Sequence, residues 1–286
     1  MSTITTSQGM LHYEVFGRGR PVILLHGWLG SWGLWQDTME FLGRNYRTYA
    51  LDFWGFGESD IKQGSFTVED FVLMVDQFME TLGIARAPLV GHSMGGTVSL
   101  ELAIRFPEKV SRVTVIGSPI HGSSLAPLLK LAGIGPIAYV VHNFMSALKL
   151  GLRVYSPLVT RDPGWADMIS RDLSKTSLQS FLQSIASLRK TDLRPRLNRV
   201  RVPVLGIYGS HDVIVHPQQW RPLEKYAPDA QILKLERSGH FPMLDEPEPF
   251  MHAVKDFLDG NPEEVNLRRE VPQNGKVRQN EVYVVR

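Results

Sequence analysis

Short apolar runs alternate with longer amphipathic segments over the first 118 residues. The runs "PVILL" (21–25), "PLVG" (88–91) and "VTVIG" (113–117) have the length and β-branched content of strands buried on both faces. The segments 67–82 and 94–110 instead repeat apolar residues at helical spacing, and Thr67 with Asp70 suggests a capping box. This alternation predicts a parallel sheet whose strands are connected by helices on its faces.

A different pattern occupies residues 119–189, where strand-like runs stop and helical fragments follow one another. We predict helices over 125–132, 136–150, 165–173 and 177–189. The alternation resumes at "VPVLGIYG" and ends with a helix over 247–258. The sequence therefore predicts a core built from residues 1–118 and 190–259, interrupted by a helical insertion at 119–189.

Beyond Gly260 the chain becomes polar and mixed in charge, and it turns apolar again only at "VYVV" (282–285). Such a segment buries too little apolar surface to offset the entropy lost on ordering. We predict a flexible tail over 260–286, with an added edge strand or a dimer contact over 281–286 as the alternative.

Composition narrows the possible functions. Hydrophobic residues make up 43% of the chain, charged residues 21%, and the net charge of +2 gives no electrostatic basis for binding nucleic acid. The absence of cysteine excludes disulfides, thiolate nucleophiles and cysteine-ligated metals. No apolar run reaches the roughly 18 to 20 residues of a membrane span, and no secretory signal is visible, so we expect a cytoplasmic protein. The oligomeric state stays open.

The stretch "GHSMGG" (91–96) places Ser93 between a strand-like run and a helix-like run. A glycine two positions before and after a serine is typical of the nucleophile elbow, a strained turn between a strand and a helix. Gly91 and Gly95 would remove the Cβ atoms that such a turn crowds, and His92 would pack beside it. The alternative is a glycine-rich turn with a structural serine.

A nucleophilic serine needs a base and a group that orients the base. His240 follows the strand-like "QILKL", and Asp212 follows "VLGIYG" in the loop that ends the preceding strand. Because the carboxyl ends of parallel strands share one edge of a sheet, we expect both beside Ser93. His211 is the alternative base, whereas the earlier "VIGSPIHG" (115–122) offers no alternative acid.

An oxyanion hole would complete such a site with two backbone N–H groups. Met94 follows the candidate nucleophile directly, and Trp28 lies in the loop after "VILLHG", where His26 and Gly27 would shape the turn. The acids and glycines of "DFWGFGESD" (52–60) lack a Walker lysine and Rossmann spacing, so Asp52 is expected to bind turn amides near His26. We predict neither a metal site nor a cofactor.

The motifs "LLHGW", "DFWGFGESD", "GHSMGG", "GSHD" and "GHFPMLDEP" occur in the order typical of one family. Over residues 10–259 the chain resembles the α/β-hydrolase superfamily, in particular its lid-bearing esterases, C–C bond hydrolases and perhydrolases. The resemblance implies a mostly parallel eight-stranded sheet flanked by helices, with residues 119–189 as a lid. It also implies that Ser93 attacks a carbonyl carbon while His240 takes its proton and Asp212 holds the imidazole.

The resemblance further implies a serine hydrolase that cleaves carboxylic esters of hydrophobic small-molecule substrates, of a chain length that the sequence leaves open. The insertion is apolar, and we expect the substrate pocket to be lined by Trp28, Leu129, Ile137, Val140 and Phe144. Alternatives on the same fold are a perhydrolase, a ligand receptor, and a C–C bond hydrolase, in which asparagine often stands where this chain has His92.

Overall fold

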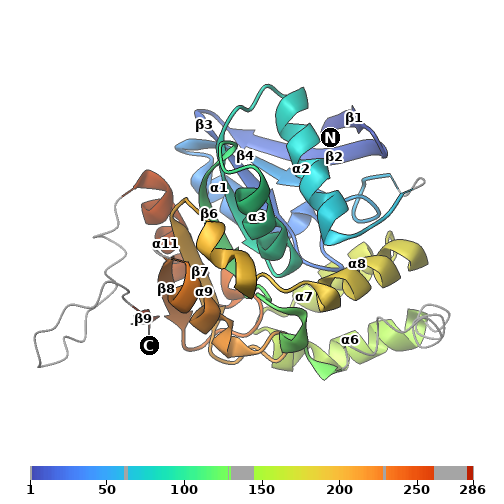
Figure 1. Cartoon of the computed structure of the whole chain (residues 1–286). Coiled ribbons are helices and arrows are strands. Elements are labelled where there is room, and N and C mark those ends of the chain that lie inside the picture. The colour runs from blue at the N-terminus through green and yellow to red at the C-terminus, as the bar shows by residue number, and fades with distance from the viewer. Residues whose placement is uncertain are drawn as a thin grey trace, which may run out of the picture.

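The computed structural model of the chain describes residues 2–60, 64–127, 129, 145–227, 230–260 and 282–285. Its centre is a nine-stranded sheet in the order β1-β2-β4-β3-β5-β6-β7-β8-β9 (Figure 1). The strands are β1 (Ser2–Thr6), β2 (Gly9–Gly17), β3 (Arg20–Leu25), β4 (Tyr46–Leu51), β5 (Ala87–His92), β6 (Val110–Ile116), β7 (Val204–Gly209), β8 (Ala230–Leu235) and β9 (Val282–Val285).

The sheet is mostly parallel. Strand β2 pairs antiparallel with β1 and with β4, and every other neighbouring pair is parallel. Strands β1–β8 confirm the predicted eight-stranded sheet. The edge-strand alternative for the tail matches β9, which extends the sheet beside β8.

Helices cover both faces of the sheet, and an apolar cluster fills the space on each side. The first cluster includes residues of α2 (Val68–Thr81), α3 (Met94–Arg105) and α9 (Trp220–Tyr226). The second includes residues of α1 (Gln36–Leu42) and α11 (Pro247–Asp259). The residues Val22 to Leu25 of β3 are fully buried because they contribute alternately to the two clusters. This explains why the central strands are continuously apolar.

The helical insertion contributes α6 (Met145–Val159), α7 (Trp165–Leu173) and α8 (Leu178–Lys190), which lie at one end of the sheet (Figure 1). The two later helices match their predicted ranges within one residue. Helix α6 is described from Met145, within the predicted 136–150 helix, and it continues past Gly151 and through Pro157. Its continuation is favoured by packing, because Leu152 and Val159 contact the core clusters. Of the predicted 125–132 helix, residues 128 and 130–132 lie outside the described residues, and Leu125 forms an isolated β-bridge with Val215 instead of helix.

Short helices complete the connections. They are η1 (Trp32–Trp35), η2 (Gly122–Ser124), η3 (Arg194–Arg199), η4 (Pro217–Gln219) and α10 (Pro242–Asp245). Thr67 and Asp70 form the predicted capping box at the start of α2. Within the described ranges, no helix combines the length and the apolar character needed to cross a membrane.

Candidate active site

Ser93 occupies the turn between β5 and α3 with φ 51° and ψ −116°, a backbone conformation that is unusual for a residue with a side chain. The turn is crowded by backbone atoms. A Cβ atom at Gly91 would lie 2.4 Å from Gly95 C, and one at Gly95 would lie 2.3 Å from Leu25 O. Glycine is therefore required at both positions, and the geometry is that of a nucleophile elbow.

The Ser93 hydroxyl lies at the N-terminus of α3. The first N–H groups of a helix have no intrahelical acceptor, so they attract negative charge. Met94 is the first residue of this helix, which makes its N–H a candidate donor to an oxyanion that forms beside Ser93. Only 6% of Ser93 is exposed, so a charge there would be poorly screened by water.

Asp212 and His240 meet at the carboxyl ends of β7 and β8. His240 Nδ1 donates a hydrogen bond of 2.7 Å to Asp212 Oδ2, and both residues are buried. The other carboxylate oxygen, Asp212 Oδ1, accepts from the backbone N–H groups of Ile214 and Val215 at 2.8 and 2.9 Å. Because His240 carries its proton on Nδ1 in this bond, its Nε2 has the lone pair that a general base needs.

His92 links the elbow to the loop of His240. Its Nε2 donates to His240 O at 2.9 Å, and the two imidazole rings lie 4.7 Å apart between centroids. Burial, with a smaller effect of the nearby His240, holds the pKa of His92 well below its ordinary value, so this ring is neutral. The described hydrogen bonds do not include a direct one between Ser93 and His240. Such bonds are often formed only when substrate is present.

The loop after β3 lies directly against the elbow. A Cβ atom at Gly27 would be 2.8 Å from His92 Nδ1 and 3.0 Å from Ser93 Cβ. His26 Nδ1 donates to Gly27 O at 2.7 Å, and His26 Nε2 accepts from Phe53 N at 3.0 Å. Burial lowers the pKa of His26, which agrees with a neutral ring that donates and accepts at once. These contacts bring the residue after Gly27, Trp28, close to the candidate nucleophile.

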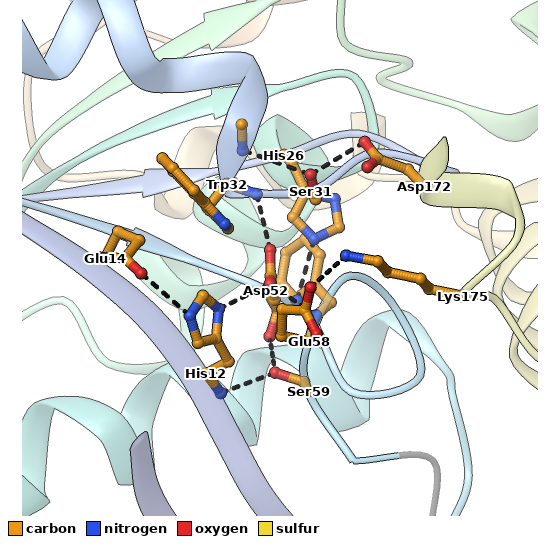
Figure 2. A network of polar contacts seen from close by, with 12 residues as sticks. His12, Glu14, His26, Ser31, Trp32, Asp52, Glu58, Ser59, Asp172 and Lys175 are labelled. Atoms are coloured by element: carbon orange, nitrogen blue, oxygen red, sulfur yellow. Dashed lines mark hydrogen bonds and ion pairs between the residues drawn. The ribbon is translucent and has the colours of Figure 1, made fainter. Parts of the chain in front are cut away.

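Asp52 is the centre of the polar network beneath this loop (Figure 2). Its Oδ1 accepts from Trp32 N at 2.6 Å, and its Oδ2 accepts from Glu58 N at 2.9 Å and from His12 Nδ1 at 2.8 Å. Burial lowers the pKa of His12, but the hydrogen bond and charge of Asp52 outweigh it and raise the pKa overall. The expected role of Asp52, binding turn amides near His26, is confirmed.

The insertion reaches the same loop through two hydrogen bonds that the sequence did not reveal. Trp28 Nε1 donates to Phe181 O in α8 at 3.2 Å, with the two rings 4.6 Å apart. Ser31 Oγ donates to Asp172 Oδ2 in α7 at 2.9 Å (Figure 2). The partners are 153 and 141 positions apart in the chain, so no local signal could have identified them.

The predicted pocket is only partly described. Trp28 is half-buried against Phe181, and Leu129 is half-buried against the first apolar cluster. Ile137, Val140 and Phe144 lie outside the described residues. An open depression of about 640 Å³ lies between the 121–127 and 212–222 segments, next to Asp212. Its described lining contains neither Ser93 nor His240. Among the described residues there is no group of His, Asp and Glu that could hold a metal ion.

Comparison with known proteins agrees with the fold. Residues 20–247 match the family model of the α/β-hydrolase fold. The chain is 28% identical to 3-oxoadipate enol-lactonase 2 of Acinetobacter baylyi, over 88% of this chain and 94% of that protein. It is also 28% identical to the pimeloyl-[acyl-carrier protein] methyl ester esterase of Vibrio cholerae, over 86% and 97%. The crystal structure of the enol-lactonase from Burkholderia xenovorans LB400 superimposes with a TM-score of 0.76 at 26% identity, covering 87% and 96%.

Proposed function

The chain belongs to the α/β-hydrolase fold family and is related to hydrolases that cleave esters, and from this premise we propose that it is a serine-type carboxylic-ester hydrolase. Ser93 is the nucleophile, His240 the general base and Asp212 the residue that orients the base. The observation that carries the proposal is the 2.7 Å hydrogen bond between His240 and Asp212, joined through His92 to the elbow of Ser93.

In the first half of the reaction, Ser93 Oγ attacks the carbonyl carbon of the ester while its proton moves to His240 Nε2. The carbonyl oxygen becomes an oxyanion, which accepts hydrogen bonds from the N–H groups of Met94 and Trp28. The bond to the alcohol oxygen then breaks, and that oxygen takes the proton from His240. The alcohol leaves, and the acyl group stays on Ser93 as an ester.

In the second half, water attacks the acyl-enzyme carbonyl and gives a proton to His240. The bond between the acyl carbon and Ser93 Oγ breaks, and His240 returns the proton to Ser93. The product is a carboxylic acid, and the enzyme is restored. Every proton is carried by His240, so the cycle requires neither a cofactor nor a metal ion.

The expected substrates are small-molecule esters with hydrophobic groups. The half-buried Trp28 ring lies in the loop beside the elbow and packs on the buried Phe181 ring, so Trp28 offers an apolar surface near Ser93. The two curated relatives are named for a lactone and a methyl ester, both of which are carboxylic esters. We therefore place ester cleavage ahead of C–C bond cleavage, perhydrolysis and ligand reception.

The test is hydrolysis of p-nitrophenyl esters from acetate to palmitate by the wild type and by Ser93→Ala. We expect the variant to lose about 10⁴-fold or more of kcat, because the acyl-enzyme can no longer form. The matched control is Ser7→Ala, which removes an exposed hydroxyl near Gln77 and should leave turnover unchanged. Equal release of nitrophenol by wild type and Ser93→Ala would show that simple esters are the wrong substrates.

Replacement of Asp212 by Asn tests the acid. We expect kcat to fall by about 10⁴-fold, since an amide at this position favours the wrong tautomer of His240. Near-wild-type turnover by Asp212→Asn would show that another residue orients the base. The matched control is Asp167→Asn on the exposed side of α7.

A further inference from the structure

The 27–31 turn is anchored near both of its ends by the core and by the insertion. On the core side, His26 donates to Gly27 O, and Asp52 accepts from Trp32 N. On the insertion side, Ser31 donates to Asp172, and the indole of Trp28 donates to Phe181 O. The turn that carries the candidate oxyanion donor therefore depends on helices α7 and α8 as well as on the sheet.

The Ser31 hydroxyl both accepts and donates a hydrogen bond. It accepts from Gly33 N at 3.3 Å as the N-cap of η1, and it gives its single proton to Asp172 Oδ2 at 2.9 Å. Ser31 and Asp172 are 6% and 2% exposed, so water does not compete for this contact. A carboxylate acceptor makes the bond stronger than one between neutral groups. The contact thus fixes the point at which the turn enters η1.

The turn itself holds a strained residue. Leu29 has φ 62°, in the left-handed region that side chains with a Cβ rarely adopt. Such a conformation persists only where the surroundings impose it. Gly30 N bonds back to Gly27 O at 3.1 Å, which closes the turn around Trp28 and Leu29. Release of the Ser31 end would let Leu29 relax, and the neighbouring Trp28 N–H would move with it.

We propose that Ser31 and Asp172 are a positioning pair through which α7 holds the 27–31 turn in the conformation that aims Trp28 N–H at the oxyanion. The role rests on the proposed function, because it presumes an oxyanion beside Ser93. Neither residue touches the substrate. The insertion thereby shapes the transition state as well as the pocket.

The surroundings of Asp172 argue against a purely stabilising contact. The charged groups that act on it are Asp52 from the end of β4, and Arg171 and Lys175 from its own segment. Burial, aided by the charge of Asp52, raises the pKa of Asp172 to about 6 in spite of the two cations and the Ser31 hydroxyl. A carboxylate kept ionised at neutral pH in this position costs folding free energy.

The experiment compares Ser31→Ala, Asp172→Leu and the double variant, using kcat and KM for the best p-nitrophenyl ester and the thermal midpoint of unfolding. Leucine keeps the branched shape of aspartate and removes the acceptor. We expect each single variant to lose about tenfold or more in kcat, because small displacements of a donor are costly. KM should change by less than about threefold, since ground-state binding is not involved. The double variant should lose no more than either single variant.

Two further variants separate positioning from general attachment of the insertion. Asp172→Asn keeps an acceptor oxygen and should restore most of the kcat that Asp172→Leu loses. Gln179→Ala removes an exposed hydrogen bond to Gly64 O that also joins the insertion to the core, and its kcat should equal that of the wild type. The inference is wrong if Ser31→Ala and Asp172→Leu lose no more kcat than Gln179→Ala. It is also wrong if their losses add in the double variant and follow the thermal midpoint.

A second readout distinguishes failure of this inference from failure of the proposed function. Diethyl p-nitrophenyl phosphate should phosphorylate Ser93 and release one nitrophenolate per enzyme, through a transition state that uses the same oxyanion donors. We expect Ser31→Ala and Asp172→Leu to slow this reaction about tenfold, in proportion to their kcat. A wild type that neither hydrolyses esters nor reacts at Ser93 would overturn the proposed function and the role of the pair together.

Discussion

The elbow of Ser93 and the 27–31 turn lie against each other, yet they are held in different ways. The elbow is fixed by its immediate backbone neighbours, because any Cβ at Gly91 or Gly95 would collide with main-chain atoms. The turn is fixed by hydrogen bonds to the Asp52 carboxylate after β4, to the Asp172 carboxylate in α7 and to the main-chain carbonyl of Phe181 in α8. The elbow is therefore held as firmly as the sheet itself, whereas the conformation of the turn depends also on contacts with the insertion.

This difference shows which parts of the site substitutions can move: the nucleophile or the second oxyanion donor. The position of the nucleophile cannot change without damage to the fold. The position of the second oxyanion donor can change through residues far from Ser93 in the sequence. We expect substitutions at the elbow to alter stability and activity together, and substitutions around the turn to alter them separately.

The largest effect is expected from Gly95→Ala, which tests whether backbone crowding fixes the elbow. The added methyl would meet Leu25 O at 2.3 Å and His26 O at 2.7 Å, and neither carbonyl can move without β3. We expect a loss of about 3 kcal/mol or more in the free energy of unfolding, measured in urea, together with loss of turnover.

The matched control is Gly151→Ala in α6, where a Cβ would have no neighbour within 4 Å. This variant should gain up to about 1 kcal/mol from helix propensity. Equal stabilities of the two alanine variants would show that crowding does not determine the elbow.

Asp172→Asn tests the contacts of the 27–31 turn, and we expect it to have the next largest effect on the free energy of unfolding. With its pKa raised to about 6, folded Asp172 binds its proton more tightly than the unfolded chain, so wild-type stability falls as pH rises from about 4 to 6. Asparagine lacks this cost. We expect the variant to be more stable than the wild type by about 2 to 3 kcal/mol at pH 8, with the gain shrinking by pH 4.5.

Urea unfolding at the two pH values measures this difference, and Asp167→Asn on the exposed side of α7 is the control. A destabilised Asp172→Asn at pH 8 would mean that the carboxylate is retained for stability, contrary to our account of the pair.

The smallest effect is expected from Trp28→Phe, which removes the indole N–H that donates to Phe181 O and keeps the aromatic packing. The loss of one hydrogen bond should lower stability by about 1 kcal/mol and kcat by about fivefold. Trp54→Phe removes a comparable bond to Thr6 at the edge of the sheet, and it should lower stability without a change in kcat. Equal kcat values for the two variants would show that the indole hydrogen bond of Trp28 does not position its backbone N–H as an oxyanion donor.

The same contrast explains what the sequence predicted. The elbow is encoded in the six residues of "GHSMGG", and the positions of Asp212 and His240 follow from strands whose carboxyl ends meet at one edge. Periodicity likewise predicted α2, α7 and α8 within a residue. These features depend on local chemistry or on regular topology, both of which leave a mark in the sequence.

The rest could not be predicted because it depends on tertiary contacts. Nothing near Ser31 indicates Asp172 as its partner, and Leu29 carries a strained backbone without the glycine that would have signalled it. The periodicity predicted a helix that ends at residue 150, but packing of the apolar face carries α6 through Gly151 and Pro157 to Val159. In each case, distant residues override the local preference.

The two apolar clusters on the faces of the sheet have a consequence for how the molecule unfolds. Trp165 and Ile169 of α7 belong to the second cluster, whereas Phe181 and Ile185 of α8 belong to the first. The insertion therefore contributes apolar side chains to the clusters on both faces of the sheet. Although it is a separate segment in the chain, it should melt with the sheet in one cooperative transition, so calorimetric and van't Hoff enthalpies should agree.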